Sequence, residues 1–539
     1  MKNHASLLLT GGRVYTGLPN APWAEAVALG GDRILFVGTT AEAEKFRGPA
    51  TEVIALAGNF LMPGLIDAHF HLLWQVHFRA GVCVDDLTEI SALQATLSSY
   101  AESHPGTQDD WILGRGFAYE LFSASQPPHR ALLDAAVPDR PLLLSSFDMH
   151  TFLANTRALE MAGLLHGDPE TPGFMLDENG LATGEMREFA ALARMEKAIP
   201  ALTPEAERAF FLRQQANLHR FGITAVQNKD GDADQLAFFR DLEADGLLRL
   251  RVQCPLMCPR GTPPEAIAEW RATHGSPTHE SPYIRTTTIK LFYDGVIDSG
   301  TAAVLSPYQA PPFGHGETIH AAGDYDALVR AADAEGFQVV THAIGDAAVR
   351  AALDAYASVP GTRRLRHRIE HIEILDPADL PRFRELGVVI SVQPIHACFA
   401  DIPAYRALIG PERHAWCFPF RTLIEAGNVL ALGSDHPVAT YDPRVTIAYA
   451  LSRPPYGGPD APAATPRHHL SIEEILAGYT RHAAYADHHE NQIGVLTAGA
   501  FADLAVFDAD PFTMAPEDFA NWNCTLTVSG GQIVHRSGI

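Results

Sequence analysis

The sequence predicts an α/β protein built around a distorted (β/α)8 barrel of the TIM type, with a small β-sandwich domain and an inserted α/β subdomain. In the middle of the chain, short apolar runs alternate with helical stretches, as parallel βα units require. Both ends of the chain instead carry strand-like alternation punctuated by glycine pairs. A chain of 539 residues is too long for one simple core, so one large domain and smaller ones are expected.

The barrel prediction depends on the number and order of the apolar runs. Eight is the number of parallel strands that closes a (β/α)8 barrel. The predicted strands are 60–67, 222–227, 250–254, 288–292, 338–342, 368–371, 388–393 and 429–435. The barrel is therefore expected to comprise residues 59–84 and 216–491.

The two ends of the chain are expected to form one domain together. Residues 1–58 and 492–539 share the texture of short hairpin strands, which predicts a composite β-sandwich. The connection over residues 85–215 is too long for a structureless loop and contains strand-like and helical runs of its own. We expect it to be an inserted subdomain that lies over the active site.

Composition restricts the classes of partner. Forty basic residues against 64 acidic ones give a formal charge of −24, which argues against nucleic acid and anionic membranes as partners. No run approaches the roughly 18 apolar residues that span a bilayer, and the leucines at 7–9 are too few for a secretory signal. We expect a cytoplasmic enzyme that acts on a small molecule. A homodimer is expected only because such assembly is common.

Polar side chains stand at the predicted strand ends, where (β/α)8 barrels carry their catalytic groups. His69 and His71 are two residues apart on one strand, so both side chains point to the same side. Later strands add Lys290, His342, His371 and Asp435 in chain order. An HxH pair alone arises by chance in a chain with 25 histidines, but the ordered set of nitrogen and oxygen ligands suits zinc or a similar divalent ion.

Lys290 needs a separate explanation. It is flanked by Ile289 and Leu291, and a cation inside an apolar strand must be compensated. An ammonium cannot bind a metal, and a lone lysine is usually solvated. A carbamate formed from this lysine and carbon dioxide is an anionic oxygen ligand that can bridge two ions. We therefore expect Lys290 to be carboxylated.

The run 61–71, Leu-Met-Pro-Gly-Leu-Ile-Asp-Ala-His-Phe-His, resembles the signature of the amidohydrolase superfamily. Further segments are similar to its YtcJ-like, or amidohydrolase 3, branch, which includes N-substituted formamide deformylases. These segments are 111–116, 289–295, 342–346, 368–371, 393–396, 433–435 and 499–504. They cover nearly the whole chain in order.

The resemblance implies a site for two divalent ions, with zinc as the expected metal. His69 and His71 with Asp435 would hold one ion, and His342 with His371 the other. Carboxylated Lys290 would bridge them together with a hydroxide. The stretches Asp148-Met149-His150 and Ser299-Gly300 stand where this branch often carries Asp-Gly-His and Gly-Ser-Arg, a departure that concerns the substrate pocket.

These residues predict a metal-dependent hydrolase that cleaves a non-peptide C–N bond of an amide-like substrate such as an N-formyl or N-acyl amine. A metal-activated hydroxide would attack the carbonyl carbon. Asp435 would accept its proton and pass it to the leaving nitrogen, as base and then acid. Arg115, His150 and His396 are candidate substrate contacts, although an ion pair or a cap explains each of them equally well.

Three alternatives stay open. The first is a deaminase or cyclic-amide hydrolase that binds one metal on the same fold. The second is an isomerase or decarboxylase of the same superfamily. The third is a non-catalytic binding protein, against which the complete ligand set argues, since a degenerate scaffold would be free to lose ligands.

Overall fold

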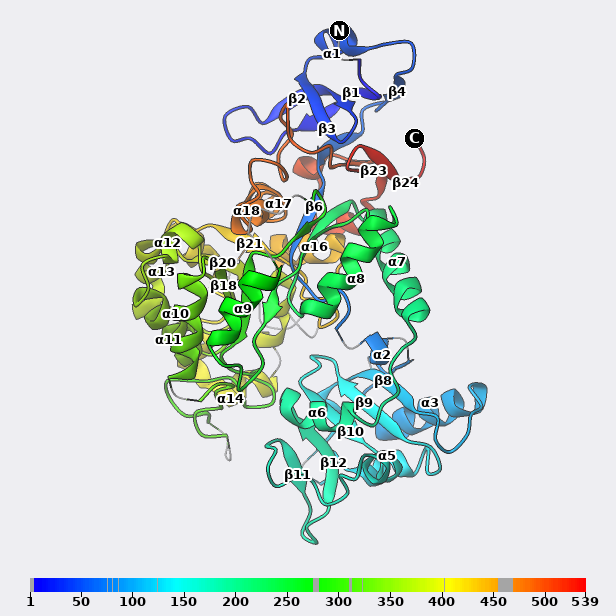
Figure 1. The fold of residues 1–539 in the computed structure, drawn as a ribbon, viewed down its shortest axis with the longest axis vertical. Helices are drawn as coiled ribbons and strands as arrows, with labels where there is room; N and C mark the ends of the chain where they lie inside the picture. The colour runs from blue at the N-terminus through cyan, green and yellow to red at the C-terminus, as the bar shows by residue number, and fades with distance from the viewer. Residues whose placement is uncertain are drawn as a thin grey trace. The chain divides into compact units, whose positions relative to one another are not determined.

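The computed structural model describes residues 4–539 except 75, 80, 86, 124, 275–280, 310–312, 322, 402 and 454–468. The chain divides into two compact units. Unit 2 consists of Leu73–Phe210 together with Asp298–Gly300, and unit 1 contains the rest, including both termini (Figure 1).

The two ends of the chain meet in one sheet of unit 1. Strand β1 (Leu7–Tyr15) pairs antiparallel with β2 (Trp23–Gly30). Its first half also pairs in parallel with β4 (Glu52–Ala55), and its second half with β5 (Phe60–Pro63). β5 in turn pairs antiparallel with β22 (Leu504–Phe507), which joins the N-terminal strands to the C-terminal ones.

This terminal sheet differs from the expected sandwich in its pairing. Its eight strands run in the order β24-β23-β22-β5-β1-β2-β3, with β4 beside β1. The remaining strands are β3 (Arg33–Gly38), β23 (Cys524–Ser529) and β24 (Gln532–Arg536). All eight therefore belong to one continuous sheet rather than two separate ones, because β5 bridges the two groups. The turn at Gly530-Gly531 has positive φ at both residues, as a type I′ hairpin turn requires.

Parallel strands form two further sheets of unit 1. One has the order β16-β14-β13-β6 and the other the order β15-β17-β18-β19-β20-β21. The first contains β6 (Leu65–Phe70), β13 (Ile223–Asn228), β14 (Arg251–Gln253) and β16 (Ile284–Arg285). The second contains β15 (Leu256–Met257), β17 (Thr288–Phe292), β18 (Gln338–Ala343), β19 (Arg368–His371), β20 (Val389–Val392) and β21 (Leu430–Leu432).

Each of the eight predicted runs contains a strand. The prediction that residues 60–67 form a single strand was wrong. The chain breaks at Gly64, so that β5 belongs to the terminal sheet and β6 to a parallel sheet. A Cβ at Gly64 would lie 2.2 Å from Oγ1 of Thr224, which explains why glycine stands at this crossing.

Closure of the parallel strands into one barrel stays a prediction. The third predicted strand, 250–254, contains β14, which pairs with β13, whereas β15, just after Pro255, pairs with β17. Proline lacks the N–H that a continuous ladder needs. A parallel bridge joins Phe70, at the end of β6, to His436 beyond β21, and so links the first and last parallel strands.

Helices cover the parallel strands. In α11, the buried residues Ala348, Val349, Ala352, Leu353 and Tyr356 form a single stripe, which packs against β18. The helices of unit 1 are α1 (Thr40–Ala43), α8 (Ala233–Ala244), α9 (Glu265–His274), α10 (Asp324–Ala334), α11 (Asp346–Ala357), α12 (Thr362–Leu365), α13 (Leu380–Leu386), α14 (Pro403–His414), α15 (Phe420–Glu425), α16 (Pro443–Ser452), α17 (Ile472–Gly478) and α18 (Arg481–Ala486). Helix α7 (Pro204–Arg220) contributes to both units.

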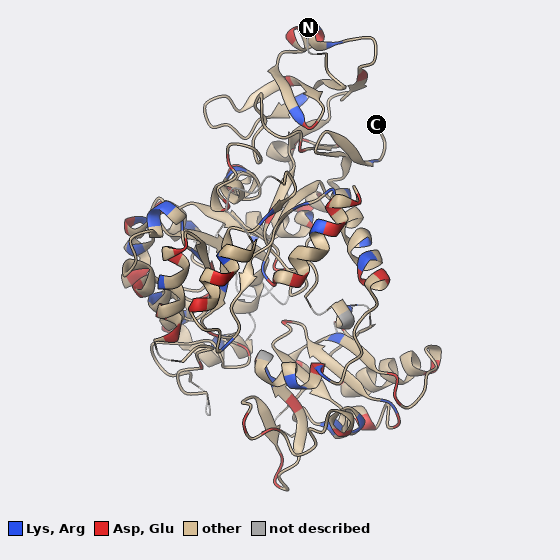
Figure 2. Cartoon of the chain, in the orientation of Figure 1, with Lys and Arg blue, Asp and Glu red and all other residues tan. Residues whose placement is uncertain are grey.

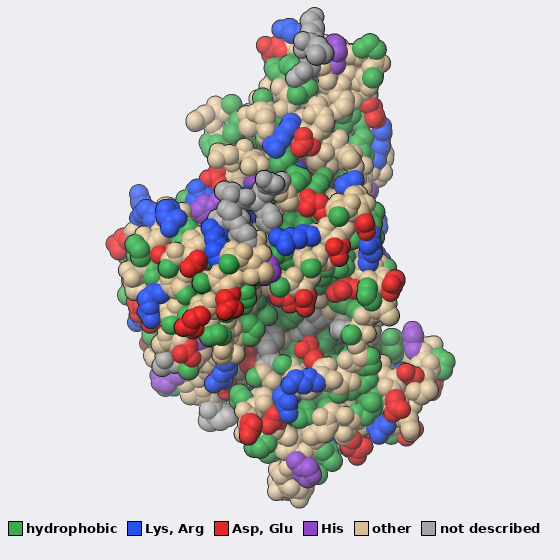
Figure 3. Space-filling view, in the orientation of Figure 1, with side chains coloured by type: hydrophobic (Ala, Val, Ile, Leu, Met, Phe, Trp, Pro, Cys, Tyr) green, Lys and Arg blue, Asp and Glu red, His purple; other side chains and the backbone are tan. Residues whose placement is uncertain are grey.

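The outer helices of unit 1 carry charges of both signs. Figure 2 shows acidic and basic residues following one another along α8, where Asp234, Arg240 and Asp241 lie. The space-filling view in Figure 3 shows hydrophobic, acidic and basic side chains intermixed on the surface. Among the described residues, none of the helices is both long and apolar enough to cross a bilayer.

Unit 2 is built on a six-stranded sheet in the order β11-β12-β10-β9-β8-β7. Its strands are β7 (Val82–Cys83), β8 (Ile112–Phe117), β9 (Leu142–Ser146), β10 (Thr151–Ala154), β11 (Phe174–Leu176) and β12 (Ala182–Arg187), and its helices are α2 (Val76–Arg79), α3 (Ile90–Ser103), α4 (Arg130–Asp134), α5 (Thr156–Ala162) and α6 (Glu188–Glu196). Leu143 and Phe152 pack in one core cluster, and Leu142 and Leu153 in another. Neighbouring strand residues point to opposite faces, so both faces of the sheet are covered.

Candidate metal centre

His69, His71 and Asp435 come together in unit 1. Nε2 of His69 lies 3.2 Å from Oδ1 of Asp435, and Nε2 of His71 lies 3.1 Å from the same oxygen. All three side chains are buried. Gly433 allows this approach, because a Cβ there would lie 2.4 Å from the backbone nitrogen of His69. The two imidazoles and one carboxylate form a ligand group for a divalent ion.

Asp435 also faces a second group, made with His371 and His396. Oδ2 of Asp435 lies 3.8 Å from Nδ1 of His371 and 3.8 Å from Nε2 of His396. The candidate ligand atoms of this group lie within 4.8 Å of one another. His371 and Asp435 both have positive φ, 74° and 59°, a conformation that is rare for residues with a Cβ and that gathers at functional sites.

His342 and Lys290 stand beside these groups. The ring centroid of His342 lies 4.5 Å from that of His371, and its Nε2 lies 3.2 Å from the carbonyl oxygen of Gly295. Lys290 is fully buried on β17, with Nζ 4.5 Å from the ring centroid of Phe292. The two groups therefore contain four of the six predicted ligands together with His396, which was predicted as a substrate contact. His342 packs against His371, and the charges of Glu370 and Asp435 act on Lys290. The ligand roles of His342 and Lys290 stay predictions.

The donor atoms of the centre fit a metal. Among the described residues, Nζ of Lys290 and Nε2 of both His371 and His396 are buried without a hydrogen-bond partner. Buried polar atoms without partners are rare in folded proteins, and each has a cause such as an ion that the protein is built to bind. Neutral imidazole nitrogens and a carboxylate are the donors that zinc and similar ions take.

Burial and neighbouring charges shift the pKa values of the candidate ligands. Burial would lower the pKa of His71, but Asp230 and Asp435 raise it above its ordinary value. Burial lowers the pKa of His69 despite the neighbouring Asp435 and Glu370, and burial holds the pKa of His371 well below its ordinary value. Burial would raise the pKa of Asp435, but His69, His71 and His371 lower it more, so that it stays well below its ordinary value. Burial also lowers the pKa of Lys290 to about 8, which favours the neutral amine that reacts with carbon dioxide.

A further group of residues supports the histidines and was assigned no role from the sequence. Glu370, on β19, accepts from Nδ1 of His69 at 2.5 Å and is itself held by Arg368. Gln393 accepts from Nδ1 of His371 at 2.9 Å. The signal was present in the strand Arg368-Ile369-Glu370-His371, in which two charged residues alternate with an apolar one toward the same side.

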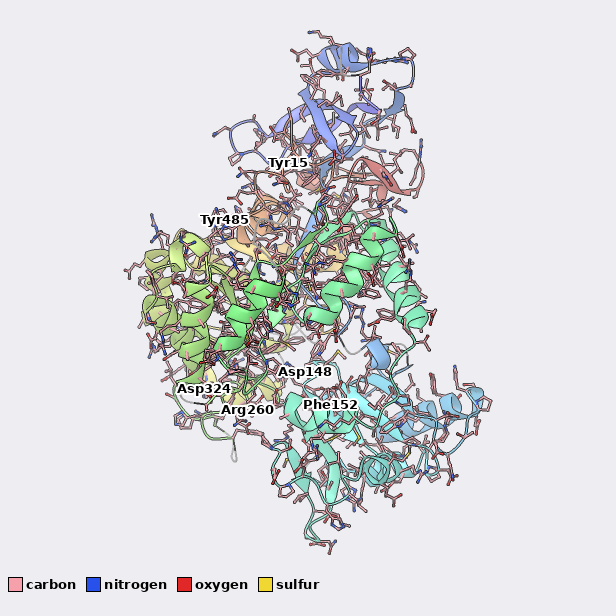
Figure 4. The ribbon with its side chains drawn as sticks, in the orientation of Figure 1. Tyr15, Asp148, Phe152, Arg260, Asp324 and Tyr485 are labelled. Atoms are coloured by element: carbon pink, nitrogen blue, oxygen red, sulfur yellow. The ribbon has the colours of Figure 1, made fainter. Side chains whose placement is uncertain are left out.

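The other two predicted substrate contacts lie in unit 2. Arg115 forms a partly exposed ion pair with Asp85 at 3.3 Å. Nδ1 of His150 lies 2.9 Å from Oε2 of Glu188, and both are buried. His150 also donates its backbone N–H to Asp148, which Figure 4 labels next to Phe152. These contacts give each residue a structural role within unit 2, so their part in substrate binding stays a prediction.

Parallel strands with histidines and an aspartate near their ends are an arrangement that suits a metal-dependent hydrolase. Comparison with known proteins agrees. Residues 52–535 match the model of the Amidohydrolase family, so the chain belongs to that family.

Several relatives support the YtcJ-like branch. YtcJ of Bacillus subtilis is 27% identical, over 98% of each chain. An N-substituted formamide deformylase of Arthrobacter pascens is 27% identical, over 96% of this chain and 95% of the relative. An uncharacterised metal-dependent hydrolase from Pyrococcus horikoshii OT3 matches in structure, with a TM-score of 0.76 and 25% identity, over 95% of this chain and 99% of that one. The chain is thus a YtcJ-like member of a family of metal-dependent hydrolases.

Proposed function

We propose that this protein cleaves a non-peptide C–N bond in an N-formyl or N-acyl amine, at a centre of two divalent ions, with zinc as the expected metal. The observation that carries the proposal is Asp435. Its two carboxylate oxygens face different groups of histidines: Oδ1 faces His69 and His71, and Oδ2 faces His371 and His396. A carboxylate between two sets of imidazoles suits two adjacent cations better than one.

The chain's own residues supply the binding and the proton transfer. His69, His71 and Asp435 would hold one ion, and His371 with His342 or His396 the other, with carboxylated Lys290 between them. Two divalent ions held by these residues would supply Lewis-acid activation of water and of a substrate carbonyl. Asp435 accepts the proton from the attacking water and delivers it to the leaving nitrogen. The strand ends that carry these groups are proposed to form the mouth of a distorted (β/α)8 barrel.

The bond is proposed from two supports. The ligand set has no redox-active thiolate and suits hydrolysis by a Lewis acid. A relative that resembles this chain over nearly its whole length is an N-substituted formamide deformylase. The ligand set supports hydrolysis, and the relative supports an amide-like C–N bond in a small molecule, with the leaving amine left open.

The test combines metal content with a substrate screen on one sample. Purified protein is expected to bind two divalent ions per chain, with zinc as the expected metal, and to hydrolyse small N-substituted formamides or acyl amines. Removal of the metal by a chelator should end turnover, and added zinc should restore it. One ion per chain with activity on cyclic amides or amino-purines would instead support a mononuclear deaminase. Turnover that survives complete metal removal would contradict the proposal.

A further inference from the structure

The histidines of the candidate centre are backed by groups of different charge. Nδ1 of His69 lies 2.5 Å from the carboxylate of Glu370, and Nδ1 of His71 lies 3.3 Å from the carboxylate of Asp230. Nδ1 of His371 instead faces the side-chain carbonyl oxygen of Gln393, at 2.9 Å. Two imidazoles thus face carboxylates, His69 through a short hydrogen bond and His71 through a longer ion-pair contact, and one faces a neutral amide.

Glu370 is fixed in place by a buried arginine. Nε and Nη2 of Arg368 both contact its carboxylate, the second at 3.1 Å. Nη2 also donates to Oγ of Ser391 at 2.6 Å and to the carbonyl oxygen of Ala68 at 2.5 Å. Because Arg368 and Glu370 are almost completely buried, the carboxylate is held in one orientation beside His69. The negative charge of Glu370 therefore lies next to Nδ1 of His69.

A carboxylate behind an imidazole strengthens the opposite nitrogen as a metal donor. It fixes the tautomer with the proton on Nδ1 and raises the basicity of Nε2, an effect on metal affinity of about 10- to 100-fold. Nε2 of His69 and Nε2 of His71 converge on the same oxygen of Asp435. Both strengthened donors therefore serve the same ion position.

The second position lacks this support. Gln393 has no charge to transmit to His371. His396 has a carboxylate nearby, but its Nδ1 lies 3.7 Å from Oε1 of Glu373, beyond a normal hydrogen bond, and the other oxygen of Glu373 accepts from Tyr405 at 3.0 Å. His342, the other candidate here, has Nε2 3.2 Å from the carbonyl oxygen of Gly295 and 3.8 Å from the carboxylate of Asp294. None of these contacts to the three histidines is a carboxylate hydrogen bond as short as that of His69.

We infer that the position formed by His69, His71 and Asp435 binds its divalent ion more tightly than the position at His371, and that Glu370 and Asp230 are the positioning residues responsible. The inference rests on the proposed two-ion centre. It predicts an order of loading: the first ion enters at His69 and His71, and the second at His371.

Zinc titration of the full-length, metal-stripped protein tests the inference. Calorimetry at fixed pH, with the bound metal counted by elemental analysis, should resolve two binding events whose Kd values differ by at least about tenfold. Glu370→Gln should weaken the tighter event about 10- to 100-fold and leave the weaker one nearly unchanged. Gln393→Glu should tighten the weaker event and bring the two together.

Two further variants make the test decisive. Glu370→Gln leaves Arg368 without its carboxylate, so Asp230→Asn provides a second route that leaves the Arg368 contacts intact and should weaken the same event. Glu490→Gln is the matched control, because Glu490 pairs with Arg366 away from the histidines and its loss should change neither event. Melting curves establish that each variant is folded.

The results distinguish a failure of the inferred order of affinities from a failure of the proposed two-ion function. Two wild-type events of equal affinity, or a Glu370→Gln protein that loses only the weaker event, would overturn the inference and leave the two-ion function standing. A wild-type protein that binds a single ion would overturn the two-ion function itself.

Discussion

The terminal sheet and the parallel sheets of unit 1 are both built of short strands, but they bury different side chains. The interior of the terminal sheet is aliphatic, with Leu9, Val27, Leu504 and Leu526 among its fully buried members. The parallel strands bury Lys290, Arg368 and Glu370 with less than 2% of each side chain exposed. The aliphatic interior contributes mainly to stability, whereas we expect the buried charges to contribute mainly to the chemistry of the site.

The energetics of burial differ in sign between the two regions. An aliphatic side chain contributes about 1.5–3 kcal/mol when it is fully buried. A buried charge costs several kcal/mol, and its partners recover that cost only when the geometry is excellent. We therefore expect substitutions in the terminal sheet to change stability and leave the chemistry intact. Substitutions at the buried charges should change the chemistry, and they should lower or raise stability according to whether the charge that is removed has a partner.

The largest effect is expected at Asp435. Asp435→Asn should lower kcat/KM about 1,000-fold, because the amide removes the charge that two groups of histidines share and the group proposed to carry the proton. Steady-state assays on the formamide that gives the highest turnover measure this. Asp510→Asn, which alters a partly exposed ion pair with Arg13, is the control and should keep activity within about twofold. Wild-type turnover by the Asp435→Asn protein would remove Asp435 from the mechanism.

The matching test of the terminal sheet is Leu526→Ala. Leu526 lies on β23 and is completely buried in the aliphatic cluster, so its truncation leaves a cavity that should cost about 2–5 kcal/mol of stability. Denaturant unfolding measures the loss, and zinc content is assayed on the same sample below the transition. The folded variant should keep its metal and its kcat. Loss of metal from folded protein would show that the two regions are not separable in this way.

A pH-dependent contribution to stability is expected from His219, near the end of α7. Its Nδ1 lies 3.1 Å from the carbonyl oxygen of Ile223, and burial lowers its pKa to about 4. The unfolded chain binds a proton near pH 6.5, but the folded chain resists it until about pH 4. His219 therefore does not change the free energy of unfolding above pH 6.5. As the pH falls toward 4, it lowers that free energy by up to roughly 3 kcal/mol.

The variant His219→Gln isolates this contribution. Unfolding free energies at pH 7.5 and at pH 4.5 should fall less steeply with acid in the variant than in the wild type. Other buried histidines, such as His489, will lower the stability of both proteins by the same amount in acid. An identical slope in the two proteins would mean that His219 takes up its proton in the folded state.

The sequence indicated the candidate ligands better than their surroundings. His69, His71 and Asp435, which the structure places within reach of one another, could be selected as candidates because strand ends and a spacing of two residues are local properties. The role of Glu370 could not be found in this way, because it depends on His69, roughly 300 positions earlier, lying 2.5 Å away. The split between β5 and β6 was missed for a similar reason: residues 60–66 have no charged side chain that marks a break, and only long-range pairing with β1 and β13 assigns the halves to different sheets.

The smallest expected change in stability comes from Lys290→Met. Unlike Leu526→Ala, this substitution should raise the free energy of unfolding. The ammonium of Lys290 is buried beside Phe292 without a hydrogen-bond partner among the described residues, and burial lowers its pKa from 10.5 to about 8. Below pH 8 the folded chain must hold a proton that the unfolded chain binds more readily, so this lysine opposes folding there. The cost fades as the pH rises from 8 toward 10.5.

Methionine has a similar length and no charge, so the metal-free variant should be about 1–3 kcal/mol more stable than metal-free wild type at pH 7. Denaturant unfolding in carbon-dioxide-free buffer measures the gap, which should narrow between pH 8 and 10.5. The same variant should lose turnover and bind less zinc. A variant less stable than wild type at pH 7 would show that neighbouring carboxylates already compensate the ammonium. A more stable but inactive protein would show that this strand keeps a lysine for its chemistry, at the expense of the fold.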